Sequence, residues 1–141
     1  MMRVVLDTNI IVSAYLNKDG PPFQVLKLAL AGMVQLCVSE PILDEYIELL
    51  RRKSFPMDKR RAVLLFQAIR AASAMVKPAS LLTITPDPDD TMFLECAQAA
   101  KAHYLVTGNT KHFPKEWKYT RRITPAAFLT VWQAEHSRFF T

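Results

Sequence analysis

The sequence predicts an α/β fold in which a central parallel sheet of four to five strands is flanked by helices, giving three layers. Short apolar runs typical of buried strands alternate along the chain with longer segments whose apolar residues recur at helical spacing. Such alternation implies parallel pairing of the strands through right-handed crossovers. The length of 141 residues, with 50% hydrophobic and 22% charged residues, suits one domain over residues 1–141 and excludes disordered and fibrous proteins.

The first 39 residues contain two predicted strands and two predicted helices. The apolar run VVL makes residues 3–6 a buried strand, and IIVSAYL after it predicts a short helix over residues 9–16. The turn-forming loop NKDGPP ends in prolines that suit the start of a helix, which we place over residues 23–31. VQLCVS at residues 34–39 is the second strand, and its last residue, Ser39, is placed to cap the next helix.

Two amphipathic helices are predicted in the middle of the chain. The first spans residues 41–53 and has an apolar stripe at helical spacing. The segment SFPMD then interrupts the pattern. Residues 58–74 predict the second helix, in which we expect Val63, Phe66 and Ile69 to face inward.

The remaining chain returns to alternating strands and helices. LLTIT at residues 81–85 is a third predicted strand, and PDPDD leads from it into a helix over residues 89–102. HYLVT at residues 103–107 predicts the fourth strand, which enters the loop GNTKHFPKEW. A last short strand at residues 121–123 and a helix over residues 125–135 complete the prediction.

Polar residues follow the predicted strands at the points where these end. They are Asp7 after the first strand, Ser39 after the second, Asp87, Asp89 and Asp90 after the third, and Thr107 and Asn109 after the fourth, with Glu45 one to two turns into a helix. Because the carboxyl ends of parallel strands meet at one edge of a sheet, we expect these side chains to converge there. Converging carboxylates repel one another unless a cation lies between them. Hard oxygen ligands favour Mg²⁺ or Mn²⁺, and the sequence has no His or Cys cluster that would indicate zinc.

Each of these residues also has an ordinary structural explanation. Asp7 could cap the helix that follows it, and Glu45 could be a surface glutamate. Asp90 lies in the first turn of its helix, where the helix dipole favours any acid. Asn109 could be a turn residue. The convergence of several acids favours the functional explanation for the set.

Four segments, in this order and at this spacing, resemble PIN-domain ribonucleases, the superfamily that includes the VapC-type toxins of toxin–antitoxin pairs. They are VVLDTNIIVSAYL, SEPILDEYIELL, DPDDTMFLECAQAAKAHYLVTGN and KHFP, and the resemblance runs from Val4 to about Pro125. It implies a PIN-like fold and a Mg²⁺- or Mn²⁺-dependent endoribonuclease. It also implies a small antitoxin protein as partner, and a homodimer, for which apolar helices around residues 63–69 are one candidate surface.

The resemblance further implies a role for each residue of the site. Asp7, Glu45 and Asp90 would be metal ligands and, with Asn109, the catalytic residues. The supporting polar shell would consist of Thr8, Asn9, Ser39, Asp89 and Thr107. Many family members have an aspartate where this chain has Asn109, and an amide brings no charge, which weakens a second metal site more than the first. Asp87 or Asp89 could supply the missing charge.

The formal net charge of +5 favours a polyanionic partner. The residues expected to contact RNA follow the fourth predicted strand, near the edge where the acids are expected to converge; they are Lys111, Lys115, Lys118 and Arg121, with Trp117 and Tyr119 as stacking surfaces. A second basic group, residues 51–53 and 59–61, is equally well explained by the preference for cations at a helix end. His112 and Arg122 belong to the same basic group as Lys111. Because a lone histidine in a loop is more often structural, we assign His112 no catalytic role.

Two other functions are compatible with parts of the sequence. A phosphatase of the haloacid dehalogenase type also has an Asp after its first strand, but it needs a second Asp where this chain has Asn9. A metal-holding PIN-like module that binds RNA or a protein without cutting is the alternative that Asn109 supports. Cys37 and Cys96 lack zinc-type spacing and are expected to be reduced, buried thiols of a cytoplasmic protein, since the sequence shows no secretory signal or membrane-spanning run.

Overall fold

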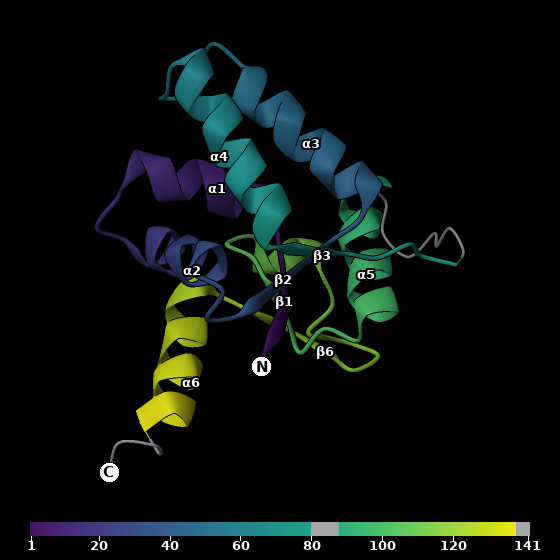
Figure 1. Ribbon diagram of the computed structural model, residues 1–141. Coiled ribbons are helices and arrows are strands. Elements are labelled where there is room, and N and C mark those ends of the chain that lie inside the picture. Colours follow the sequence, from purple (N-terminus) through teal and green to yellow (C-terminus); the bar gives the residue numbers. More distant parts are fainter. Residues whose placement is uncertain (80–87, 138–141) are drawn as a thin grey trace.

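The computed structural model describes residues 1–79 and 88–137, and within these ranges the strands form one six-stranded sheet (Figure 1). The strands are β1 (Arg3–Leu6), β2 (Gln35–Val38), β3 (Ser73–Met75), β4 (Tyr104–Val106), β5 (Glu116–Trp117) and β6 (Thr120–Ile123). Their order in the sheet is β3-β2-β1-β4-β6-β5, and all neighbours are parallel except β5 and β6. This mostly parallel sheet confirms the predicted α/β class, with one strand more than expected.

Helices lie on both sides of the sheet. They are α1 (Thr8–Leu16), α2 (Pro21–Leu30), α3 (Glu40–Arg51), α4 (Lys59–Ala72), α5 (Pro88–Ala100) and α6 (Pro125–Ser137), with a short 3₁₀ helix η1 (Thr110–His112). In Figure 1, α1, α2 and α6 lie to the left of the central strands and α5 to the right, while α3 and α4 run side by side at the top. No helix in the described ranges has the length and apolarity needed to cross a bilayer.

The helix boundaries follow local sequence signals. Pro21 and Pro22 occupy the first positions of α2, where a missing backbone N–H costs nothing. Gly32, with a φ of 73°, ends the same segment in the left-handed conformation. Asp58 caps α4 by accepting a 2.8 Å hydrogen bond from the Arg61 backbone N–H. Ser39 stands at the cap position of α3 as predicted, but among the described residues its side chain makes no capping hydrogen bond.

Two strands differ from the sequence prediction. The helix expected over residues 58–74 ends at Ala72, and Ser73–Met75 instead form β3 beside β2. β5 lies in a stretch predicted as loop, and Lys118, with a φ of 54°, makes the turn into β6. Both strands are too short to show an alternating pattern, so their pairing partners decide their conformation. The strand predicted at residues 81–85 lies outside the described residues.

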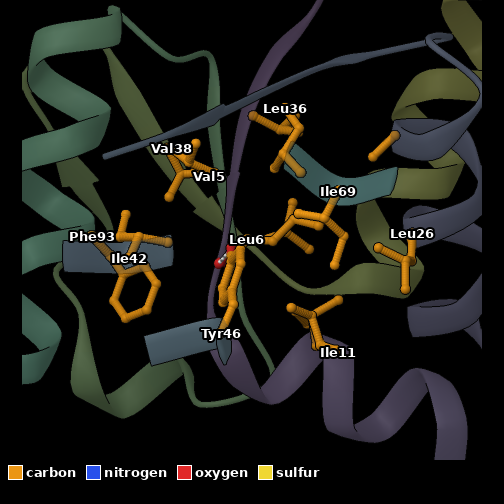
Figure 2. Close-up of a cluster of buried hydrophobic side chains, with 14 of the residues drawn as sticks. Val5, Leu6, Ile11, Leu26, Leu36, Val38, Ile42, Tyr46, Ile69 and Phe93 are labelled. Carbon is orange, nitrogen blue, oxygen red and sulfur yellow. Dashed lines mark hydrogen bonds between the residues drawn. The ribbon is translucent and has the colours of Figure 1, made fainter. Parts of the chain in front are cut away.

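Tyr46 lies at the centre of the apolar core (Figure 2). Its side chain is fully buried, and its hydroxyl donates a 2.6 Å hydrogen bond to the carbonyl oxygen of Leu6. Ile42 and Phe93 pack in the same cluster, so α3, α5 and β1 meet at this point. The contact fixes α3 against the last residue of β1, immediately before Asp7.

The buried face of α4 is slightly rotated from the one predicted. Ala62, Leu65 and Ile69 are buried, and Phe66 is partly buried and packs against the core, whereas Val63 is 54% exposed. Of the three residues expected to face inward, Ile69 and Phe66 contact the core and Val63 does not. Apolar residues occur on more than one side of this helix, and the sequence pattern alone does not tell which of them are buried.

Cys37 and Cys96 are free and buried, as predicted. Burial raises the pKa of both thiols, that of Cys96 to about 12. Both therefore stay protonated at neutral pH and act as small apolar side chains.

Candidate functional site at the carboxyl edge of the sheet

Asp7 and Thr107 come together because the two strands that precede them are parallel neighbours. Leu6 of β1 lies opposite Val106 of β4, so the next residue of each strand reaches the same edge of the sheet. The Thr107 hydroxyl donates a 2.8 Å hydrogen bond to Oδ2 of Asp7. Both residues are buried, which confirms the prediction that these strand ends meet.

The Asp7 carboxylate is held where water solvates it poorly. Burial raises its pKa, against the smaller lowering effects of the Thr107 hydrogen bond, the Asn9 backbone, the charge of His112 and the Thr8 backbone. Asp7 is also the N-cap residue of α1, and its backbone carbonyl accepts a 2.9 Å hydrogen bond from the Ile10 backbone N–H. In the described part of the chain its side chain makes no well-aligned capping hydrogen bond. The backbone N–H groups of Thr8 and Asn9, in the first turn of α1, nevertheless interact with the carboxylate and help to hold it at this helix end.

Glu45 reaches the same edge from α3. Its Oε1 accepts a 2.9 Å hydrogen bond from the hydroxyl of Thr8, the residue after Asp7. Burial raises the pKa of Tyr46 well above its usual value, and the negative charges of Asp7 and Glu45 raise it further. Both carboxylates therefore lie within electrostatic reach of the Tyr46 hydroxyl.

Asp90 approaches from the first turn of α5 and pairs with His112. Oδ2 of Asp90 lies 3.4 Å from Nδ1 of His112, and the Asp90 side chain is only 18% exposed. Because His112 also lowers the pKa of Asp7, it lies close enough to both acids to link them electrostatically. From the sequence, His112 was expected only as a member of the basic group near the RNA, not as a partner of the acids. Its position three residues after Asn109, in the loop that leaves β4, was the signal that could have placed it here.

The other predicted site residues are less closely involved. The Asn109 backbone N–H donates a 2.9 Å hydrogen bond to the Thr107 hydroxyl, while the Asn109 residue as a whole is exposed. Asn9 is exposed on α1, and Ser39 is buried at the end of β2. Asp87 and the side chain of Asp89 lie outside the described part of the structure.

We refer to Asp7, Glu45, Asp90, Thr8, Thr107 and His112 as the acid rim. In the described residues, no three Asp, Glu, His or Cys side chains come together closely enough to enclose one metal ion. The contacts of these acids include those with Thr107, Thr8 and His112. Carboxylate oxygens around a buried, poorly solvated aspartate are the donors that Mg²⁺ or Mn²⁺ prefers, so the chemistry of the rim fits such an ion.

The basic residues expected to contact RNA do not all lie at the acid rim. Lys111 is in η1, directly after the loop that contains Asn109. Arg121, in contrast, pairs in register with Tyr104 at the amino end of β4, about 10 Å along the strand from Thr107. Lys118 lies in the turn just before β6, at that same far edge, and Arg121 is also paired with Glu116 at 3.4 Å. The expectation that Lys118 and Arg121 lie near the rim is therefore wrong.

Replacing Thr107 with Val is expected to destabilise the fold by about 1–3 kcal/mol, because the buried Asp7 carboxylate and the Asn109 N–H both lose a hydrogen-bond partner. Urea unfolding measures the change. Thr107→Ser keeps the hydroxyl and serves as the control, which should lose much less. If the Val variant is as stable as the Ser variant, the hydroxyl bridge does not hold the rim together.

The chain is similar to known proteins in both sequence and fold. The sequence model of the PIN domain matches residues 3–111. An uncharacterized protein of Methanocaldococcus jannaschii is 28% identical over 111 residues, which is 77% of this chain and 71% of that protein.

Two solved structures are similar in fold. The DNA-bound VapBC of Salmonella typhimurium aligns with a TM-score of 0.61 at 18% identity, covering 89% of this chain and 99% of the matched chain. VapBC2 of Rickettsia felis, bound to a DNA fragment from their promoter, aligns with a TM-score of 0.58 at 20% identity, covering 87% and 98%. These similarities confirm the predicted architecture.

Proposed function

The chain belongs to the PIN-domain family, and from this we propose that it is a divalent-metal-dependent endoribonuclease that acts as the toxin of a toxin–antitoxin pair. The observation that carries the proposal is the buried carboxylate of Asp7, held by Thr107 at the carboxyl edge of the sheet, with Glu45 and Asp90 reaching the same edge. Ligands of open α/β sheets bind at this edge.

Asp7, Glu45 and Asp90 would hold the ion, which is Mg²⁺ or Mn²⁺ in this proposal. A bound divalent ion supplies a water of lowered pKa and neutralises charge on a phosphate. Thr107 and Thr8 fix the rotamers of Asp7 and Glu45 through the hydrogen bonds that they donate. Asn109 contributes a neutral amide to the same edge, and Lys111 and His112 offer positive or donor groups to the phosphate backbone of the substrate.

Two partners are part of the proposal. RNA is the substrate, favoured by the net charge of +5 and by Lys111 beside the rim. Lys115, Lys118 and Arg121 would contact RNA only where it extends beyond the rim. The similarity in fold to toxin subunits of VapBC complexes suggests a small antitoxin protein as the second partner. We place the protein in the cytoplasm and expect it to form a homodimer, as the family resemblance implies.

Cleavage of labelled RNA tests the activity, with Mn²⁺, Mg²⁺ or EDTA added and single-stranded RNA, structured RNA and DNA as substrates. Glu45→Gln is expected to reduce the metal-dependent rate at least about tenfold, since changes next to a metal site cost 10–100-fold. Glu48→Gln is the matched control, because Glu48 lies one turn along the same helix, is 72% exposed and pairs only weakly with Arg52. Equal rates for the two variants would remove Glu45 from the site.

A non-cleaving PIN-like module that binds RNA or a protein is the second candidate. The neutral Asn109 favours it, because an amide brings no charge to a second metal ion. Absence of cleavage by a folded wild type, together with a rise in its unfolding temperature on adding Mn²⁺, would establish this alternative.

A further inference from the structure

A second stripe of residues on α4 lies beside the face that packs on the core. The core-facing residues of this helix are Ala62, Leu65 and Ile69. The second stripe has the same helical spacing and consists of Lys59, Val63, Phe66, Gln67 and Arg70, of which Val63 and Phe66 are apolar. Phe66 packs partly against the core, but core packing does not explain Val63, which is 54% exposed.

The stripe forms one wall of an open groove of about 580 Å³, which we call the α3–α4 groove. The other wall comes from α3, whose Ile47, Leu50 and Arg51 are spaced at three and four residues. The two helices run side by side at one end of the molecule (Figure 1). None of the groove residues belongs to the acid rim.

The two ends of the groove are positively charged. Arg51 ends α3 and Lys59 begins α4, so both lie near the loop that joins the helices, while Arg70 lies at the other end. Lys59 and Arg70 are 11 residues apart on one helix, which corresponds to about 16 Å. The described part of the lining contains no acidic residue, and no ion pair between described residues involves these three cations.

We propose that the α3–α4 groove binds an amphipathic helix of a partner protein, with an apolar stripe on one face and acidic residues at both ends of that stripe. The apolar floor of the groove would pack against the apolar face of the partner helix. The cations at the two ends of the groove would pair with the acidic residues of that helix. A second copy of this chain is a poor occupant of its own groove, because the same cations would face each other. RNA would leave the aliphatic floor of Ile47, Leu50 and Val63 without a partner. The proposal is independent of nuclease activity.

Fluorescence anisotropy with designed peptides tests the proposal. The probe is a labelled helical peptide of about five turns, with leucines on one face and glutamates about 11 residues apart, and its counterpart has lysine in place of each glutamate. The full-length wild type is expected to bind the acidic probe at least about tenfold more tightly than the lysine probe. Lys59→Glu combined with Arg70→Glu should reverse this preference.

Val63→Glu should weaken binding of the acidic probe at least about tenfold, because it places a charge on the apolar floor. Leu16→Glu is the matched control, since Leu16 is an exposed leucine, at 70%, on α1 and outside the groove. Circular dichroism tests whether each variant is folded. If Val63→Glu does not fold, the variant with Lys59→Glu and Arg70→Glu decides whether the groove binds the acidic probe. Both single variants should cleave RNA as well as the wild type does.

Four outcomes would overturn the proposal. The first is equal binding of the two probes, and the second is equal loss of binding in Val63→Glu and Leu16→Glu. The third is a pair of results: a short oligouridine displaces the acidic probe from the wild type, and Val63→Glu loses oligouridine binding. Together these would assign the groove to RNA. The fourth is a wild-type dimer in sedimentation that Val63→Glu dissociates, which would assign the groove to a second copy of the chain.

Discussion

Asp7→Asn is expected to lower RNA cleavage to below about 1% of the wild-type rate, since changes even beyond the ligands of a metal site cost 10–100-fold. The amide still accepts the hydrogen bond from Thr107, so the fold should be kept. Asp44→Asn is the control, because Asp44 is an exposed acid on the surface of α3. Cleavage by Asp7→Asn at the wild-type rate would show that the buried carboxylate takes no part in the reaction.

The same variant should be more stable than the wild type at neutral pH when no metal is added. Burial raises the pKa of Asp7 above 3.8, so the charged carboxylate opposes folding. As the pH rises from 3.8 through the higher pKa of the folded state, the wild type loses stability that the asparagine variant keeps. Thermal unfolding of both proteins across this range measures the difference, and added Mn²⁺ should raise the midpoint of the wild type alone. A less stable variant at neutral pH would contradict the burial argument.

Tyr46→Ala is expected to destabilise the protein by about 3–5 kcal/mol, because it leaves a cavity between α3, α5 and β1. Tyr46→Phe keeps the ring and removes only the hydroxyl that donates to the Leu6 carbonyl, so its cost should be about 1–3 kcal/mol. Urea unfolding of the two variants separates the ring from the hydrogen bond. Equal costs would mean that the hydrogen bond, and not the packed ring, fixes α3 against β1.

The sequence predicted those elements whose pattern repeats over several residues. The strands β1, β2 and β4 and the helices on either side were predicted with small shifts at their ends. The strands β3 and β5 were missed because three and two residues carry no periodic signal. The rotation of α4 was missed for a different reason: apolar residues occur on more than one side of the helix, and only its contacts with neighbouring elements select Ala62, Leu65 and Ile69.

The same distinction applies to the candidate site. The meeting of Asp7 with Thr107 follows from parallel strands, and it was therefore visible in the order of the elements. The contact between Asp90 and His112 depends on the path of η1, which the residues in that loop do not specify. Lys118 and Arg121 were misplaced because β6 begins at the far edge of the sheet, a consequence of its parallel pairing with β4.

The central position of β1 has a consequence for protein synthesis. Thr107 and Asp7 are 100 residues apart in the chain, and β1 needs β4 as its neighbour before their side chains can meet. During translation, Asp7 is therefore synthesised long before Thr107, whose hydroxyl positions the Asp7 carboxylate. Closing so long a loop is entropically costly and slow. Any activity that depends on this pair of residues begins only after most of the chain has been translated and has folded.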